Sequence, residues 1–280
     1  MIDFMEPYVF IIDLDGTIIG DCSYQCDIYN IQNIMKNKIK IFRTEKAKCE
    51  TILKNSYNKK SLLIRPYFNV FMTMIKKIYP HSYIFVYTAS EKEWAIKEIN
   101  IIEKENNIKF NRPIFTRDNC ILDKDGNIKK SVEKIMPMIK KTMKVNKNHD
   151  ISKRLLIIDN NPTFIDYHNN FLLCPSYNYI KFNNLWDGLS ENYLKCSDLK
   201  KFIKKLTEAR KMHNIPHTYN QEKQEKIYKW LYKKHKNINK YNSSYINDTF
   251  WRDIIILIKY NNVKEFNKNI ISHMVKSIKV

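Results

Sequence analysis

The sequence predicts an α/β protein in which a parallel β-sheet is flanked by helices. Short apolar runs, rich in β-branched and aromatic residues, alternate with segments of helical length and periodicity. Several of these runs end in polar residues that can take part in chemistry. Alternation of this kind indicates βαβ units, whose strands are parallel and whose ligands bind at the carboxyl ends of the strands.

The apolar runs that we predict to be strands differ in length but share this composition. They are Tyr8–Leu14, Tyr83–Tyr87, Pro113–Phe115, Arg154–Ile158 and Tyr179–Phe182. Because the carboxyl ends of parallel strands meet at one edge of a sheet, we expect Asp13, Thr88 and Asp159 to lie close together there.

Helical periodicity predicts the connecting and flanking helices. The predicted helices are Phe68–Ile78, Glu91–Glu105, Lys129–Lys144, Asp198–Met212, Gln221–His235, Thr249–Tyr260 and Val263–Ile278. Pro137 should kink or split the third of them. Residues 22–57 are polar and Lys-rich and are expected to be a helical insertion, and Asp123–Asn127 has the composition of a turn.

The character of the chain changes beyond residue 212. The periodic pattern is interrupted at Pro216, and residues 211–280 contain 14 Lys and Arg against 5 Asp and Glu. We therefore predict an α/β domain over residues 1–212, with an insertion at about 20–60, and a basic helical extension over residues 213–280.

The chain of 280 residues has a formal net charge of +20. Such a surface favours anionic partners, such as nucleic acid, phosphopeptides or acidic lipid, but general solubility of a Lys-rich chain explains it equally well. The six cysteines are scattered and form no CxxC pair, which favours reduced thiols. Without a signal-peptide pattern or an apolar run of membrane-spanning length, we expect an intracellular protein, cytoplasmic or nuclear, that is not secreted and binds no membrane.

Four elements that could move a phosphoryl group occur in one order along the chain. They are Asp13-Leu14-Asp15-Gly16-Thr17, Thr88, a lysine near residue 130, and Asp159-Asn160. The carboxylate of Asp13 can attack phosphorus and form an aspartyl-phosphate. The carboxylate of Asp15, two residues later, can lean toward the same pocket, protonate the leaving oxygen and then take a proton from water.

Carboxylates gathered around a phosphate repel it unless a hard cation offsets their charge. Asp159 and Asn160, at a neighbouring strand end, would complete an oxygen-rich site that suits Mg²⁺. Thr88 offers a hydroxyl to a phosphoryl oxygen, and the lysine supplies positive charge for the same oxygens. Together these residue types predict magnesium-dependent hydrolysis of a phosphate ester.

The motifs resemble those of a known superfamily. Asp13–Thr17, Thr88 and Asp159 look like the motifs of the haloacid dehalogenase (HAD) superfamily. More narrowly, the chain is similar to the phosphatases of the RNA polymerase II C-terminal domain, also called NLI-interacting-factor-like phosphatases. The segments that carry this likeness are Arg65-Pro66, Val86–Ser90, Gly126-Asn127 and Ile157–Pro162, within residues 8 to 205.

This resemblance implies a Rossmann-like, HAD-like fold without a large cap. It implies that Asp13 is the nucleophile and that Asp15 is the general acid and base. The Mg²⁺ ligands that it implies are Asp13, the main-chain carbonyl of Asp15, and Asn160. Asp159 would support these ligands.

The resemblance also implies how the phosphoryl group is held. Thr88 would bind one of its oxygens, and a lysine that follows the Gly126-Asn127 turn would bind another. Lys130 fits this position best, and Lys129 is the second choice. The implied substrate is phosphoserine or phosphothreonine in a protein or peptide.

Three functions are compatible with the sequence. The first is a protein serine/threonine phosphatase whose partner is a phosphorylated protein or peptide, including the polymerase tail. The second is a HAD phosphatase acting on nucleotides or nucleic-acid end phosphates, which the net charge favours, as does Gly16, where the family usually has Glu. The third is a non-catalytic module that binds nucleic acid or RNA polymerase through the basic extension, which the complete set of catalytic residue types disfavours.

Overall fold

The structure is a computed structural model. The residues it describes are 6–20, 63–179, 201 and 243–278. The site residues and every α-helix and β-strand named below belong to one compact unit, which is built from Met1–Gly20, Ser56–Tyr177 and Asn247–Val280. The predicted insertion over residues 22–57 and the predicted helices Asp198–Met212 and Gln221–His235 lie outside the described residues, apart from Lys201.

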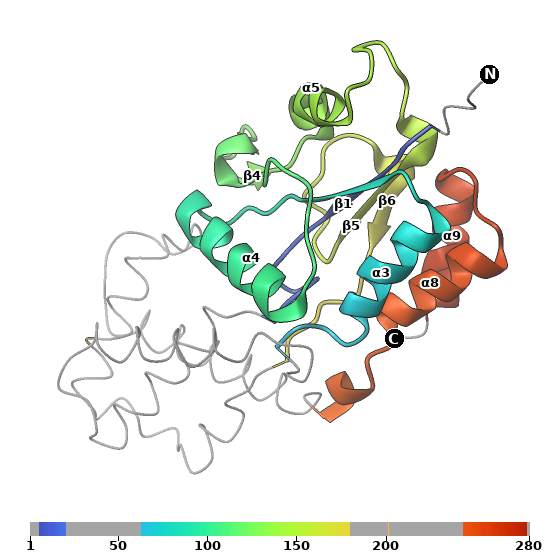
Figure 1. Ribbon diagram of the computed structural model, residues 1–280. Coiled ribbons are helices and arrows are strands. Elements are labelled where there is room, and N and C mark those ends of the chain that lie inside the picture. Colours follow the sequence, from blue (N-terminus) through green and yellow to red (C-terminus); the bar gives the residue numbers. More distant parts are fainter. Residues whose placement is uncertain (1–5, 21–62, 180–200, 202–242, 279–280) are drawn as a thin grey trace. The chain divides into compact units, whose positions relative to one another are not determined.

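A four-stranded parallel sheet forms the centre of this unit, with strand order β2-β1-β5-β6. Its strands are β1 (Tyr8–Ile12), β2 (Ser82–Val86), β5 (Leu155–Asp159) and β6 (Phe171–Leu173). Ile12 of β1 lies opposite both Val86 of β2 and Ile158 of β5. The chain therefore leaves these three strands at the same level, as the sequence predicted (Figure 1).

Helices and a small hairpin complete the described part of the chain. The helices are α3 (Phe68–Ile78), α4 (Lys92–Asn106), α5 (Val132–Met143), α8 (Phe250–Tyr260) and α9 (Lys268–Ser277). The antiparallel hairpin pairs β3 (Ile121–Leu122) with β4 (Ile128–Lys129). The short 3-10 helices are η1 (Arg117–Asn119), η2 (Ser152–Arg154), η3 (His168–Asn170) and η6 (Ser243–Asn247).

The two faces of the sheet are covered by different helices, because successive side chains of a strand point to opposite faces. Val9 and Ile11 of β1 belong to the buried cluster that contains Ile135 of α5. Phe10, which lies between these two residues, points to the other face and packs its ring edge-on against Phe71 of α3. Figure 1 shows α5 on one side of the sheet and α3 with α8 on the other. The sheet is therefore the middle layer of an α/β fold, as predicted.

The end of the chain packs against the sheet. The hydroxyl of Tyr8 donates to the carbonyl of Lys264 at 2.8 Å, and that of Tyr79 donates to the carbonyl of Val263 at 2.6 Å. Trp251 of α8 is fully buried. The described end of the predicted basic extension is thus part of the same compact unit as the strands, while a domain boundary at residue 212 stays a prediction.

Several local predictions need correction. The helix predicted from Lys129 begins at Val132, because Ile128 and Lys129 pair with the other strand of the hairpin. Of the two outcomes predicted for Pro137, a split does not occur: the helix continues through this exposed residue, where water can satisfy the carbonyl that proline leaves unpaired. A kink at Pro137 stays a prediction. Pro113–Phe115 is no strand: Phe115 makes one isolated bridge to Tyr87.

The fourth strand of the sheet, β6, was not predicted. The expected last strand, Tyr179–Phe182, has its first residue outside any strand, and residues 180–182 lie outside the described residues. Within the part of the chain that the structure describes, no helix is both long enough and apolar enough to cross a membrane.

Candidate active site

Three of the predicted site residues, two aspartates and a buried lysine between them, meet at the carboxyl edge of the sheet. Asp13 follows β1, Asp159 ends β5, and Lys130 follows β4; their exposed fractions are 6%, 1% and 2%. The Lys130 Nζ lies 2.6 Å from Asp13 Oδ1 and 2.8 Å from Asp159 Oδ2. One ammonium group therefore joins the carboxylates of two neighbouring strands, in a place where water has little access.

The backbone around Lys130 explains how its side chain reaches this position. Its N–H donates to the carbonyl of Thr163 at 3.0 Å, and its carbonyl accepts from the N–H of Ile165 at 3.1 Å. Directly afterwards α5 begins, where the carboxylate of Asp166 accepts from the Ser131 hydroxyl at 2.6 Å. Lys129, the second candidate, instead lies 3.8 Å from Asp123 at the surface hairpin.

Burial and charge act in opposite directions on the Asp13–Lys130 pair. Burial and the nearby Asp159 carboxylate raise the pKa of Asp13 to about 6, although the charge of Lys130 opposes this rise. The two carboxylates raise the pKa of Lys130 above its ordinary value despite its burial. The lysine is therefore cationic at neutral pH and can hold an anionic group at the strand ends.

Thr17 links the two sides of the site. Its hydroxyl lies 3.4 Å from Asp13 Oδ2 and 3.2 Å from Asn160 Oδ1, and it accepts from the main-chain N–H of Asn160 at 3.2 Å. The Asn160 Nδ2 donates to the Ser176 hydroxyl at 3.1 Å, which leaves Oδ1 on the side of Thr17. Sequence reasoning gave Thr17 no role, although it closes the Asp13–Thr17 motif.

Asp15 and Thr88 are joined through Ser90, whose role was also missed. The Ser90 hydroxyl donates to Asp15 Oδ2 at 2.9 Å, and its N–H donates to Thr88 Oγ1 at 3.1 Å. Thr88 itself is buried. The predicted acid–base carboxylate and the predicted phosphoryl-binding hydroxyl thus lie on the same short network. The signal in the sequence was the motif Tyr87-Thr-Ala-Ser90.

The donor set suits the predicted magnesium ion. Asp13, the Asp15 carbonyl and Asn160 would supply only oxygen atoms, which Mg²⁺ prefers. Among the described residues, no group of three or more His, Cys, Asp or Glu side chains could hold a metal ion. The predicted donor set is of another kind, because it combines one carboxylate with an amide oxygen and a main-chain oxygen. Asp159 accepts from Asn161 N–H at 2.7 Å and from Lys130, which suits a supporting role.

Gly16 is the place where a side chain would disturb this arrangement. Its φ is +79°, and a Cβ atom there would lie 2.6 Å from Asn160 Nδ2. Gly126 offers a matched control, because it has a φ of +77° and a Cβ atom there would meet nothing within 4 Å.

We expect Gly16→Ala to lower the free energy of unfolding by more than Gly126→Ala does. The left-handed backbone costs both variants on the order of 1–2 kcal/mol, whereas only the first must also displace Asn160. Urea unfolding and magnesium titration measure the two effects. Equal losses of stability with equal magnesium affinities would contradict the close contact at Gly16.

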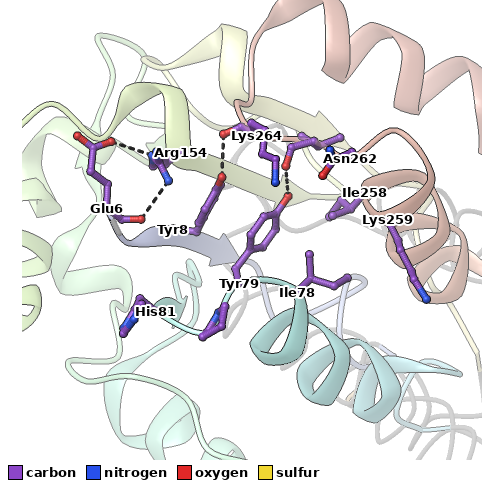
Figure 2. Close-up of a pocket in the computed structure, with 12 residues that line it drawn as sticks. Glu6, Tyr8, Ile78, Tyr79, His81, Arg154, Ile258, Lys259, Asn262 and Lys264 are labelled. Atoms are coloured by element: carbon purple, nitrogen blue, oxygen red, sulfur yellow. Dashed lines mark hydrogen bonds and ion pairs between the residues drawn. The ribbon is translucent and has the colours of Figure 1, made fainter. Parts of the chain in front are cut away.

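A cavity of about 740 Å³ lies at the opposite edge of the sheet (Figure 2). It is lined by Tyr8 at the start of β1 and by the carboxyl ends of α3 and α8. Lys259 stands in the last turn of α8, where a cation offsets the partial negative charge of the helix end. Arg154 is paired with Glu6 at 2.8 Å. Arg154 and Lys259 therefore have structural partners, and none of the predicted site residues lies in this cavity.

A family model and two solved structures match this chain. A family model described as NLI interacting factor-like phosphatase matches residues 8–213. A HAD-superfamily hydrolase of subfamily IA, variant 1, from Geobacter sulfurreducens matches with a TM-score of 0.31 and 10% identity, over 56% of this chain and 82% of its own. Fcp1, an essential RNA polymerase II CTD phosphatase, matches with a TM-score of 0.36 and 17% identity, over 96% of this chain and 70% of its own. Among curated protein sequences, none matches significantly.

Proposed function

The chain belongs to the NLI interacting factor-like phosphatase family, and from this premise we propose that it is a magnesium-dependent protein serine/threonine phosphatase that acts through an aspartyl-phosphate. The observation that carries the proposal is the meeting of Asp13, Lys130 and Asp159 at one edge of the sheet. A buried carboxylate beside a fixed cation is the arrangement that a phosphoryl group needs for attack and for charge neutralisation.

The first step transfers the phosphoryl group to the protein. An oxygen of Asp13 attacks phosphorus, and the bond from phosphorus to the serine or threonine oxygen of the substrate breaks. Asp15 gives its proton to that leaving oxygen. Lys130 and Thr88 hold the other phosphoryl oxygens during the transfer.

The second step releases phosphate. Water attacks the phosphorus of the aspartyl-phosphate, Asp15 takes the proton of that water, and the carboxylate of Asp13 is set free. Mg²⁺, held by Asp13, the Asp15 carbonyl and Asn160, would offset the negative charge that gathers in both steps. The contact between Ser90 and Asp15 keeps the acid–base carboxylate beside Thr88.

Removal of magnesium tests this proposal. We expect a chelator to lower phosphate release from a phosphoserine or phosphothreonine peptide by at least about 100-fold, because the clustered carboxylates then repel the substrate. Added Mg²⁺ should restore the rate. The unfolding midpoint measured in the same buffers separates inhibition from loss of structure. Release that is unaffected by the chelator, or no release from any phosphomonoester with Mg²⁺ present, would contradict the proposal.

A second candidate keeps the chemistry and changes the substrate to a nucleotide or a nucleic-acid end phosphate. The net charge of +20 and Gly16 favour it. Parallel assays with a phosphopeptide and with oligonucleotides phosphorylated at the 5′ or 3′ end distinguish the two, and we expect a higher kcat/KM for the peptide.

Nucleic-acid or polymerase binding by the basic surface needs a separate test. Because residues 247–280 pack in the same unit as the sheet, deletion of residues 211–280 would remove part of the core. Lysine substitutions between residues 223 and 240 are therefore the cleaner experiment. A non-catalytic binding module would show salt-sensitive binding that these substitutions weaken, together with no phosphate release.

A further inference from the structure

Arg65 is a buried cation that is paired with a residue far away in the sequence. It precedes α3, and 1% of its side chain is exposed. Its Nε and Nη2 atoms each lie 2.9 Å from one carboxylate oxygen of Asp248. The ring centroid of Phe250, at the start of α8, lies 4.4 Å from the guanidinium carbon. A bidentate pair of this kind fixes the position and the orientation of the guanidinium group.

The remaining donor of Arg65 points to another segment, Cys174–Tyr177, which follows β6. The Nη1 atom donates to the carbonyl of Pro175 at 2.8 Å and lies 3.8 Å from Cys174 Sγ. The ring of Tyr177 lies 5.5 Å from the guanidinium carbon. Arg65 therefore connects the start of α8 to this segment.

The segment Cys174–Tyr177 in turn contacts the magnesium side of the candidate site. The N–H of Cys174 donates to the carbonyl of Asp159 at 2.9 Å, and the N–H of Tyr177 donates to the carbonyl of Gly16 at 2.7 Å. The Ser176 hydroxyl accepts from Asn160 Nδ2 at 3.1 Å. Because its amide nitrogen is engaged in this way, Asn160 turns its oxygen toward Thr17, whose hydroxyl lies 3.4 Å from Asp13 Oδ2.

We propose that Asp248 is a positioning residue for the magnesium site, acting through Arg65 and the segment Cys174–Tyr177 on Asn160. The inference rests on the proposed function, because it assigns Asn160 to the cation. Asp248 lies beyond residue 213, where the match to the family ends. The residues that lead into α8 would therefore contribute to the magnesium site, although they lie outside the region that the family model matches.

A positioning role and a purely structural role of the Asp248–Arg65 ion pair predict different effects when Asp248 is replaced. Without the Asp248 carboxylate, the buried guanidinium group loses its counter-charge and must seek another acceptor. The acceptors nearest to it lie in the segment Cys174–Tyr177, so a shift of the guanidinium group would displace this segment, including Ser176. A positioning role therefore changes magnesium affinity, whereas a structural role changes only the unfolding midpoint.

The test compares Asp248→Asn with two reference variants of the full chain. Asp253→Asn is the matched control, because Asp253 lies five residues further along the chain, in the first turn of α8, and contacts Thr249 at 2.6 Å and Arg252 at 3.2 Å. Asp248→Glu keeps the charge. Calorimetric titration with Mg²⁺ alone, without substrate, measures the affinity of folded protein.

We expect Asp248→Asn to weaken magnesium binding by about 10- to 100-fold, the usual loss when a group that supports a metal ligand is removed. Asp253→Asn should bind as the wild type does, and Asp248→Glu should recover part of the loss. The kcat at saturating Mg²⁺ should fall less than the magnesium affinity does.

Ser176→Ala provides an independent variant if Asp248→Asn does not fold. It removes only the acceptor of the Asn160 amide and leaves the pair of Arg65 and Asp248 intact, and it should also weaken magnesium binding. Unchanged affinity in either folded variant would overturn the positioning role. Failure of the wild type to release phosphate from any substrate would instead count against the proposed function, which makes the two failures distinguishable.

Discussion

Replacement of Asp13 by Asn should lower kcat/KM for a phosphopeptide by at least about 10⁴-fold, which is the scale of loss when an enzyme's nucleophile is removed. An amide oxygen cannot form the aspartyl-phosphate, so the loss should appear in kcat rather than in KM alone. Steady-state phosphate release with saturating Mg²⁺ measures it. Asp125→Asn, in the exposed turn of the hairpin, should keep the wild-type rate.

The same variant should have nearly the stability of the wild type. Burial raises the pKa of Asp13, which means that the ionised carboxylate is disfavoured in the folded protein. Asn removes this ionisation, so the unfolding midpoint in metal-free buffer should stay within about 4 °C of the wild type or rise. A variant that is both inactive and unfolded would leave the nucleophile unassigned, whereas a folded variant that retains full activity would exclude Asp13 from the reaction.

Replacement of Lys130 by Met should affect both stability and activity. It leaves the carboxylates of Asp13 and Asp159 buried without the ammonium group between them, and loss of one partner from a buried pair costs about 3–5 kcal/mol. Urea unfolding in metal-free buffer measures this loss. Phosphate release should fall by about 100- to 1,000-fold, since a fixed charge at the phosphoryl group is removed.

The stability loss in Lys130→Met should depend on pH in a defined direction. A carboxyl group whose folded pKa is raised stabilises the fold below its unfolded pKa, which is about 3.9 for Asp, and this contribution is lost as the pH rises through the folded pKa. The folded pKa of Asp13 is about 6 with Lys130 present and should be higher without it. The variant should therefore lose less stability at pH 5 than at pH 8.

Lys129→Met is the matched control for this experiment. Lys129 is the adjacent lysine and faces Asp123 at the surface hairpin, so its replacement should change neither stability nor activity by much. A larger effect from Lys129 than from Lys130 would reverse the assignment of the phosphate-binding lysine. Equal, small effects would show that no cation is needed between the two aspartates.

The central strands could be predicted because their burial is complete. All five residues of β1 are buried, and so are all five of β5. The five residues of β1 and the first four of β5 therefore form uninterrupted apolar runs in the sequence. The strand β6 has three residues with mixed exposure, which is too short for periodicity to detect. The start of α5 was misplaced because Lys129 has a high helix propensity, while pairing with Ile121 across the hairpin decides its conformation.

Site residues that follow a predicted strand and have reactive side chains could be proposed from the sequence. Residues whose roles depend on partners distant in the sequence were missed. Asp13 could be proposed from residue types and order, and Lys130 from the resemblance to the family. Ser90 stands in the motif Tyr87–Ser90, but its contact with Asp15 could not be predicted, and Ser176 lies in none of the motifs, because a serine gains its role only through the partner that tertiary structure brings to it. Asp248 gave no local signal either, since its partner Arg65 lies 183 positions away.

The central place of β1 in the sheet has a consequence for biosynthesis. Ile12 lies between Val86 and Ile158, so β1 is synthesised before both of the strands that pair with it. During translation an apolar strand with two open edges is exposed, which is the kind of segment that chaperones protect. Non-local pairing of this type also slows refolding. Nascent chains that stop before β5 should therefore be prone to aggregation and lack enzymatic activity.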